Sequence, residues 1–144
     1  MSLQVEKITR NDQLKAAYFI RKEVFVIEQK VDPNKEYDEF ESVSKHFIAC
    51  INGKPTGTAR WRVTPYGVKL ERFAVLKEAR GKGVGLALVV AVLEDIKENP
   101  DAASMNKYLH AQLSAVPLYQ KFGFEIVGDI FEECNIMHYK MQLA

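Results

Sequence analysis

The segment Arg80–Gly85, with the sequence Arg-Gly-Lys-Gly-Val-Gly, restricts the fold of this chain more than any other feature. It joins a strand-like pattern that ends near Leu76 to a helical pattern over residues 83–97. Glycines let the backbone come close to a ligand, and the start of a helix presents free N–H groups and a positive dipole end. With the charges of Arg80 and Lys82, this predicts a turn that binds phosphate. The alternative is a tight connection whose charges are solvated.

Two nucleotide-binding folds use similar turns, and neither fits this sequence. A P-loop continues from its glycines into Lys and then Ser or Thr, whereas Leu86-Ala87-Leu88 follows here. A dinucleotide-binding turn, aligned on Gly83 and Gly85, needs its third glycine where Leu88 stands. The turn therefore supports neither of these two folds.

Length and composition indicate one globular domain, residues 1–144, with 47% hydrophobic residues to form its core. The formal net charge of +1 argues against a general nucleic-acid binder. The longest nearly uncharged stretch, residues 83–93, is 11 residues long, whereas a membrane-spanning helix needs about 20. We therefore expect no membrane span. Because the first residues lack an apolar signal core, we expect a cytoplasmic protein.

The hydrophobic periodicity predicts a mixed α/β (α+β) fold. Asn52-Gly53 predicts a hairpin, because a two-residue turn of this kind needs positive φ at both positions. We expect a sheet of six to seven strands with an antiparallel N-terminal meander, a helical crossover and helices on both faces. The expected strands cover residues 3–8, 46–51, 56–63, 68–76, 107–113, 124–130 and 135–143, and the expected helices end near Gln29, Lys97 and Lys121.

Cysteine and histidine residues give weaker indications. Cys50 and Cys134 stand beside apolar residues and are expected to be reduced core thiols. No pair of histidines or cysteines has the spacing of metal ligands, so we expect no metal site.

Charge is distributed unevenly along the chain. Residues 60–82 hold seven basic and two acidic residues, a local net charge of +5. Residues 28–41 hold six acidic and two basic residues, a local net charge of −4. The basic segment contains the glycine-rich turn and suits a polyphosphate ligand. The acidic segment is expected to be a loop or short helix on the surface.

Two blocks of the sequence resemble those of the GNAT superfamily of N-acetyltransferases. The turn at residues 80–85 resembles its Arg/Gln-x-x-Gly-x-Gly/Ala loop, which binds the pyrophosphate of acetyl-CoA. Residues 112–124 resemble its Asn-x-x-Ala-x-x-Leu-Tyr-x-Lys-x-Gly-Phe block, with Gln112 in place of the usual Asn. Residues 21–29 are similar to the Arg-x-x-Val-Phe-x-x-Glu-Gln helix of a small bacterial branch of the family.

The resemblance implies an acyltransferase that uses acetyl-CoA as co-substrate and moves the acetyl group directly to a primary amine. The acceptor would be a small molecule or a peptide, and a homodimer is left open. The alternative is a non-catalytic module that senses acyl-CoA or binds a partner. The implied cofactor-binding residues are Phe73, Ala74 and Val75, whose backbone would pair with the pantetheine arm, Arg80, Gly81, Lys82, Gly83, Val84 and Gly85 at the pyrophosphate, and Gln112 and Tyr119.

Two catalytic residues are implied. Tyr119 would protonate the departing CoA thiolate, and its alternative role is to anchor a short helix. Glu71 would remove the amine proton, and its alternative is an ion pair with Arg60 or Arg62 on the neighbouring strand. His46 or a water molecule is a further candidate for the base. The acidic segment 28–41 would suit a cationic acceptor or be a solvated surface.

A second histidine, His110, falls on an expected strand. It would line the cleft or be buried or exposed away from it, because strand alternation allows all three.

Overall fold

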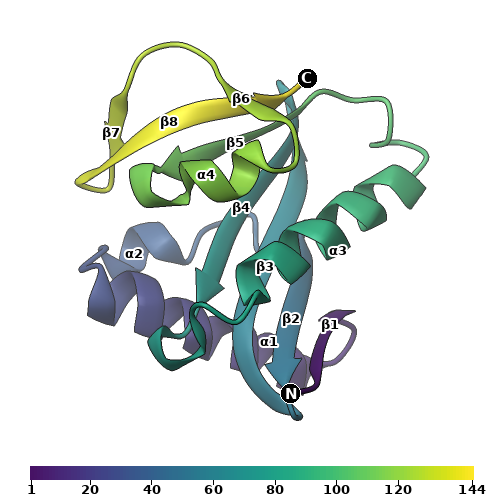
Figure 1. Ribbon diagram of the computed structural model, residues 1–144, viewed down its shortest axis with the longest axis vertical. Helices are drawn as coiled ribbons and strands as arrows, with labels where there is room; N and C mark the ends of the chain where they lie inside the picture. The colour runs from purple at the N-terminus through teal and green to yellow at the C-terminus, as the bar shows by residue number, and fades with distance from the viewer.

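The computed structural model describes residues 1–144, which form one mixed sheet with helices on both faces (Figure 1). Its strands are β1 (Leu3–Lys7), β2 (Lys45–Ile51), β3 (Lys54–Thr64), β4 (Gly67–Val75), β5 (Lys107–Gln112), β6 (Phe124–Ile126), β7 (Phe131–Glu133) and β8 (Ile136–Leu143). The α-helices are α1 (Asn11–Arg21), α2 (Pro33–Glu36), α3 (Val84–Glu98) and α4 (Val116–Gln120). A π-helical segment, η1 (Lys22–Glu28), continues α1, and 3₁₀ turns η2 (Lys77–Ala79) and η3 (Leu113–Ala115) precede α3 and α4.

The sheet has the order β1-β2-β3-β4-β5-β8-β6, and β7 also pairs with β8. Strands β1 to β4 are antiparallel neighbours and β4 pairs with β5 in parallel, which confirms the expected meander and crossover. The hairpin between β2 and β3 turns at Asn52 and Gly53, with φ of 51° and 82°. The sheet has eight strands because the strand expected over 124–130 is interrupted. Gly128 has a φ of 81°, and β6 and β7 on either side of it pair with opposite ends of β8.

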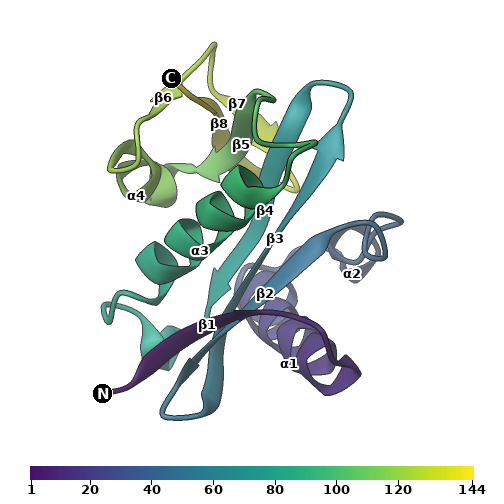
Figure 2. The same cartoon turned by 90° about the vertical axis from the view of Figure 1, so that its right-hand side faces the viewer.

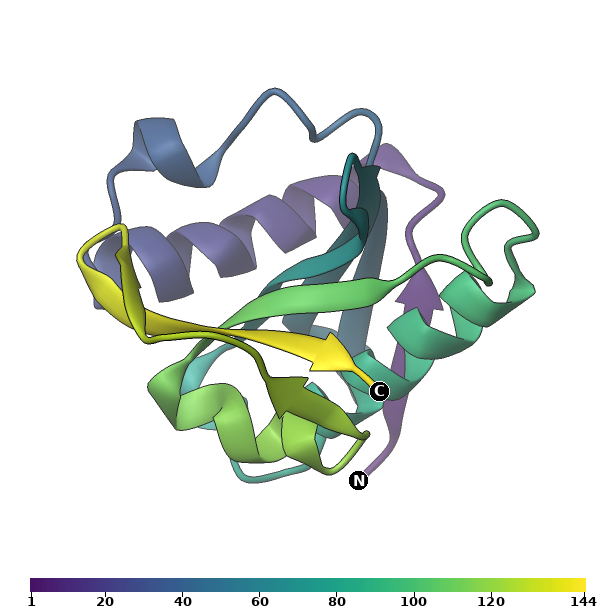
Figure 3. The ribbon, with the colours of Figure 1, turned by 90° about the horizontal axis from the view of Figure 1, so that it is seen from above.

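Two apolar clusters hold the layers together. The larger lies between the sheet and helices α3 and α4, and includes Trp61, Leu88 and Ile96. The smaller lies on the other face, where Ile20 and Val24 of the first helix pack near Ile48. Figure 3 shows α1 on one side of the sheet and α3 and α4 on the other. Burial of apolar surface on both faces is the main contribution to the stability of such a three-layer arrangement.

A glycine in β3 sets the position of the glycine-rich turn. A Cβ added to Gly57 would lie 2.7 Å from Cγ1 of Val84 and 3.1 Å from Cδ1 of Leu88. Only glycine therefore allows the first turn of α3 to approach the sheet this closely. Figure 2 shows α3 running across β3 and β4 at this place. Local sequence patterns do not predict this contact, because Gly57 and Val84 are far apart in the sequence.

Strands β4 and β5 pair over only three residues each. Val68–Leu70 pairs with Lys107–Leu109, and beyond this point the two strands diverge (Figure 1). The edge of β4 over residues 71–75 thus faces a gap rather than a neighbouring strand. Backbone N–H and C=O groups on such an edge are free to bind an extended ligand. No helix of the chain is both long and apolar enough to cross a membrane.

Candidate active site

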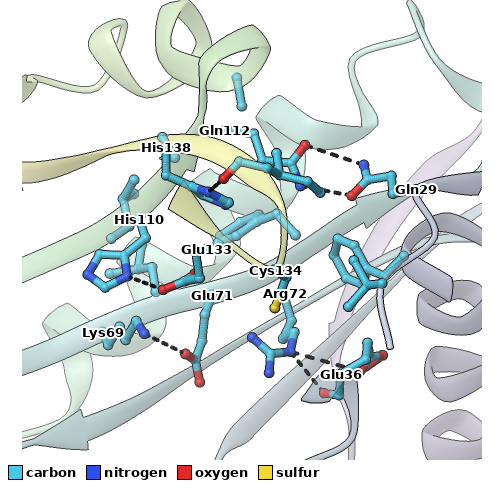
Figure 4. A pocket seen from close by; sticks show the side chains of 18 of the residues that line it. Gln29, Glu36, Lys69, Glu71, Arg72, His110, Gln112, Glu133, Cys134 and His138 are labelled. Atoms are coloured by element: carbon cyan, nitrogen blue, oxygen red, sulfur yellow. Dashed lines mark hydrogen bonds and ion pairs between the residues drawn. The ribbon is translucent and has the colours of Figure 1, made fainter. Parts of the chain in front are cut away.

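The gap between β4 and β5 opens into a cavity of about 170 Å³. Its walls come from the end of β4, the end of β5, the segment after α1, and the turn between β7 and β8 (Figure 4). The lining residues include Gln29, Glu71, Arg72, Phe73, His110, Gln112, Tyr119, Glu133 and Cys134. The diverging strands therefore bring together several residues that were predicted for the site and several that were not.

A bulge in β4 shapes one wall of the cavity. Arg60 pairs with Glu71 and Thr58 pairs with Ala74, so β4 has one more residue than β3 between these pairs. Arg72 takes up the extra length with a φ of 60°. Non-glycine residues adopt this conformation rarely, and bulges of this kind redirect backbone groups beside active sites. The sequence carries no signal for it, because Arg is not a residue that favours positive φ.

Tyr119 is buried against the sheet, and its side chain lines the cavity. Its ring packs edge-on against Phe73 with centroids 5.7 Å apart, and against Phe124 at 6.2 Å. Burial raises the pKa of the Tyr119 hydroxyl. The Tyr119 hydroxyl has no hydrogen-bond partner within the protein. Every fully buried side-chain polar atom does have one, so this hydroxyl is not fully buried and is open to the cavity. The residue thus anchors the helix and also presents a protonated donor.

The glycine-rich turn has the backbone that the sequence predicts. Gly81 and Gly83 have φ of 77° and 83°, and Gly83 is the N-cap residue of α3. The first N–H groups of a helix have no intrahelical partner, so they can donate to an anion there. The guanidinium of Arg80 is held by Glu28 through two hydrogen bonds of 2.6 Å. Arg80 therefore already has an anionic partner, whereas the neighbouring Lys82 is exposed.

Glu71 lies in the cavity wall, and its carboxylate is ion-paired. It accepts hydrogen bonds from Arg60 Nε at 2.8 Å and from Arg62 Nε at 2.7 Å, and Lys69 Nζ lies 3.3 Å away. Burial opposes ionisation, but Arg60, Arg62 and Lys69 outweigh it and lower the pKa of Glu71 to about 2. Glu71 therefore forms the ion pairs with Arg60 and Arg62 that were considered as the alternative to a catalytic role. A carboxylate with so low a pKa is a weak proton acceptor.

The two oppositely charged segments pair with one another. Arg21 and Arg60 are almost completely buried, and both donate to Glu41, at 2.8 Å and 2.7 Å. Arg21 also binds Glu36, and Arg60 also binds Asp38. Glu28, a fourth carboxylate of the acidic segment, is bound by Arg80. The segment contains the short helix α2 and exposed residues on either side of it, which confirms the expected loop or short helix on the surface. Arginines bind four of its six carboxylates, so these four are not free to attract a cation.

The acceptor-site role considered for His46 is not supported by its position. The ring is buried, and Nε2 lies 2.8 Å from the backbone oxygen of Glu41. Burial lowers the pKa of His46. Its side chain does not line the cavity, so it is a structural residue of the buried charge network.

His110 and Glu133 form a dyad in the cavity wall. Nδ1 of His110 lies 3.1 Å from Oε2 of Glu133, and the His110 hydrogen bond lowers the pKa of that carboxylate (Figure 4). The ring packs edge-on against Phe131 at 5.1 Å. Nε2 of His110 has no partner in the protein. His110 thus lines the cleft, which is one of the three positions that strand alternation allowed. Glu133 was not predicted, because it reaches the cleft only through pairing of the short strand β7 with β8.

Two glutamines close one end of the cavity. Gln112, at the end of β5, donates from Nε2 to Oε1 of Gln29 at 2.8 Å, and Gln29 returns a longer contact of 3.4 Å (Figure 4). Gln29 directly follows the π-helical segment η1. Its backbone N–H donates to the backbone oxygen of Val24, which is the last i to i+5 hydrogen bond of that segment. Single turns of this kind are frequent at functional sites. Gln112, predicted from the sequence to contact the cofactor, thus lies beside the cavity.

Both cysteines are free. Cys134 lines the cavity in the turn between β7 and β8, where it and Asn135 have φ of 52° and 63°. It is therefore not a core residue as expected, whereas Cys50 packs against the smaller apolar cluster. No group of three potential metal ligands lies close enough together to hold an ion.

Comparison with known proteins decides the family. Residues 7–144 match the family model described as Acetyltransferase (GNAT) domain. The chain belongs to the GNAT acetyltransferases. It is 40% identical over 136 residues to the uncharacterized N-acetyltransferase YjcF of Bacillus subtilis, covering 93% of this chain and 95% of that protein. This confirms the resemblance on which the acyltransferase prediction was based.

Solved structures agree with this assignment. The acetyltransferase superposes on an acyl-CoA N-acyltransferase of Pseudomonas aeruginosa with a TM-score of 0.85 and 28% identity, covering 99% of this chain and 100% of the other. It superposes on ElaA of Escherichia coli with a TM-score of 0.86 and 26% identity, over 99% and 100% of the two chains. The fold and the acyltransferase class are thus both established, and an acyl-CoA is the co-substrate that the family supports.

Proposed function

We propose that this acetyltransferase moves an acetyl group from acetyl-CoA directly to a primary amine that enters the cleft between β4 and β5. The observation that supports this most is the divergence of the two strands after Leu70 and Leu109. It leaves one free strand edge for the pantetheine arm and a cavity for the acceptor. The glycine-rich turn lies beyond the same end of β4, so that one extended ligand can reach both.

The cofactor is proposed to bind along residues 73–85. The edge of β4 over Phe73, Ala74 and Val75 has no β5 neighbour, and its backbone would pair with the amides of the pantetheine arm as an added strand does. The oxygen of Val75 accepts a hydrogen bond from Nε of Arg80 in the free protein, so this bond would open to admit the arm. Gly81 to Gly85 would donate backbone N–H groups to the pyrophosphate, with Lys82 adding charge and Arg80 positioned by Glu28. Gln112 and Tyr119 would face the arm from the β5 side.

His110 is proposed as the general base, in place of Glu71. A protonated amine must lose a proton before it attacks the thioester. With Nδ1–H donated to Glu133, the neutral ring leaves Nε2 free to accept that proton, directly or through a water molecule. Glu71 is held by Arg60 and Arg62 instead. The attacking amine forms the new C–N bond, and the C–S bond of the thioester breaks.

Tyr119 is proposed to stabilise the departing thiolate. The raised pKa of its hydroxyl keeps it protonated at neutral pH, so it can donate a hydrogen bond to sulfur as negative charge develops there. The free hydroxyl and the packing against Phe73 on β4 support this placement.

The test is a steady-state assay with purified protein, acetyl-CoA and a panel of amines. Free thiol is detected during turnover, and the N-acetyl product is identified by mass spectrometry. We expect amine-dependent thiol release with one product per CoA. Tight binding of acetyl-CoA without turnover on any amine would favour the alternative of an acyl-CoA sensor.

A further inference from the structure

A second hollow, of about 350 Å³, lies beside the active-site cavity on the same sheet. It is lined by side chains of β3, β4, β5 and β8 and by the turn before β4, and none of the lining residues is acidic. Its basic residues are Arg62, Lys69 and Lys140. The mechanism described above uses none of them, so this hollow needs its own explanation.

The three cations have few anionic partners. Lys69 and Arg62 share the single carboxylate of Glu71, which Arg60 also binds. The terminal Nη1 and Nη2 groups of Arg62 make no hydrogen bond, although its guanidinium lies 3.9 Å over the ring of Phe40. Lys140 has no ion pair, and its Nζ lies 5.3 Å from the centre of the Tyr108 ring.

These cations are held in place rather than free in solvent. The side chains of Arg62 and Lys69 are only 13% and 16% exposed. Partly buried cations with unused donors attract an anion, and a guanidinium with two free terminal nitrogens fits a carboxylate or phosphate through paired hydrogen bonds. Tyr108 and Thr64, whose hydroxyl groups are 2.6 Å apart, form the polar floor between them.

The hollow is continuous with the acceptor side of the active site. Lys69 and His110 line both cavities. A molecule whose amine lies near His110 can therefore extend along the sheet face toward Lys140, which pairs with His110 in the ladder of β5 and β8. The acidic segment 28–41 does not counteract this, because its carboxylates near the cleft are bound by arginines.

We propose that the acceptor is a small amine that carries an anionic group, carboxylate or phosphate, at the end away from its amino group. Arg62, Lys69 and Lys140 bind that group, and the amine is then placed at His110. This inference rests on the proposed acetyl transfer and names its substrate class.

The experiment compares matched acceptors that differ only in the anionic group. O-phosphoethanolamine is compared with ethanolamine, and β-alanine with β-alanine amide, each with acetyl-CoA and the wild-type protein. We expect kcat/KM to be about tenfold or more higher for the anionic member of at least one pair, as for a charge-assisted hydrogen bond. The pair with the larger ratio of kcat/KM values shows whether the site prefers a phosphate or a carboxylate. Raising the salt concentration should reduce the ratio.

Two variants and a control locate the effect. Lys140→Gln should reduce the anionic preference, the ratio of kcat/KM for the anionic and the neutral amine, about tenfold, and Lys140→Glu should abolish it. Lys97→Gln, an exposed lysine near the end of α3, should have no effect. Equal kcat/KM for both members of both pairs in the wild type, or an anionic preference that Lys140→Glu leaves intact, would overturn the inference.

Binding without turnover separates this inference from the proposed function. O-phosphoethanolamine and ethanolamine are titrated into the protein with CoA bound, and the dissociation constants are measured by NMR. Tighter binding of the anionic amine that Lys140→Glu removes supports the anion site even if no amine is acetylated. Turnover of neutral amines only, with no difference in binding, supports acetyl transfer and contradicts the anion site.

Discussion

Nδ1 of His110 lies 3.1 Å from Oε2 of Glu133, although the two residues are 23 positions apart in the sequence. The contact fixes the ring and leaves Nε2 free for the acceptor. We expect His110→Gln to lower kcat/KM by roughly 10²- to 10⁴-fold, as for loss of a general base.

Glu133→Gln should reduce the rate less than loss of His110, because the amide can still contact the ring but stabilises the imidazolium poorly. Glu71→Gln, checked for folding by circular dichroism, is the comparison. If Glu71→Gln lowers kcat/KM by this amount and His110→Gln leaves it unchanged, Glu71 is the base.

Tyr119→Phe tests the donor to the thiolate. The ring that packs against Phe73 and Phe124 is kept, so the midpoint of thermal unfolding should stay near the wild-type value. We expect kcat to fall about 10²-fold, comparable to removal of one oxyanion donor, with the dissociation constant for acetyl-CoA unchanged. Tyr139→Phe, in β8, is the matched control. An unaltered kcat would mean that solvent alone stabilises the leaving group.

Gly83→Ala tests the pyrophosphate turn, with Gly53→Ala as its control. Both glycines have positive φ, 83° and 82°, and an added Cβ would meet no atom within 4 Å at either position. Both substitutions should therefore cost about 1–2 kcal/mol in unfolding free energy. Only Gly83→Ala should also raise the dissociation constant for acetyl-CoA, measured by isothermal titration calorimetry. Similar cofactor affinity in the two variants would argue against phosphate binding at this turn.

Arg60 is fully buried and binds Asp38, Glu41 and Glu71. Arg60→Met should lower the unfolding free energy by about 3–5 kcal/mol, because it leaves buried carboxylates without their partner. Arg10→Gln, which breaks the exposed pair with Asp12, should lower the unfolding free energy far less, because solvent screens this pair. Urea denaturation of the two variants measures both values. Equal losses would mean that the buried network contributes no more than a surface pair.

The same network predicts how stability depends on pH. Hydrogen bonds and charge from Arg60 lower the pKa of Asp38 to about 2, and arginines with Lys69 lower that of Glu71 to about 2. Both values lie below those of the unfolded chain, near 4. The stabilisation is therefore complete above about pH 5 and is lost as the pH falls toward 2. Urea unfolding at successive pH values should show this decline, and a constant unfolding free energy between pH 5 and 2 would contradict it.

Local patterns allowed much of the fold to be predicted. Alternation located the strands of the meander, Asn52-Gly53 located the hairpin, and the glycines of residues 80–85 located the turn before α3. These features depend on φ, ψ and side-chain direction within a few residues. The bulge at Arg72 could not be predicted in this way, because it depends on the register of β4 against β3.

The sequence by itself determined the glycine-rich turn with the strand before it and the helix after it, and with them the family. Only the tertiary structure decided which charges are free. The segment 60–82, with a net charge of +5, was expected to suit a polyphosphate, and the segment 28–41, with −4, to suit a cationic acceptor or be a solvated surface. Folding pairs Glu36, Asp38 and Glu41 with arginines in a largely buried network, because an unpaired charge in the interior costs far more than one paired with its opposite. Lys69 and Arg62 share the carboxylate of Glu71, and Lys140 of β8, which lines the same hollow, forms no ion pair.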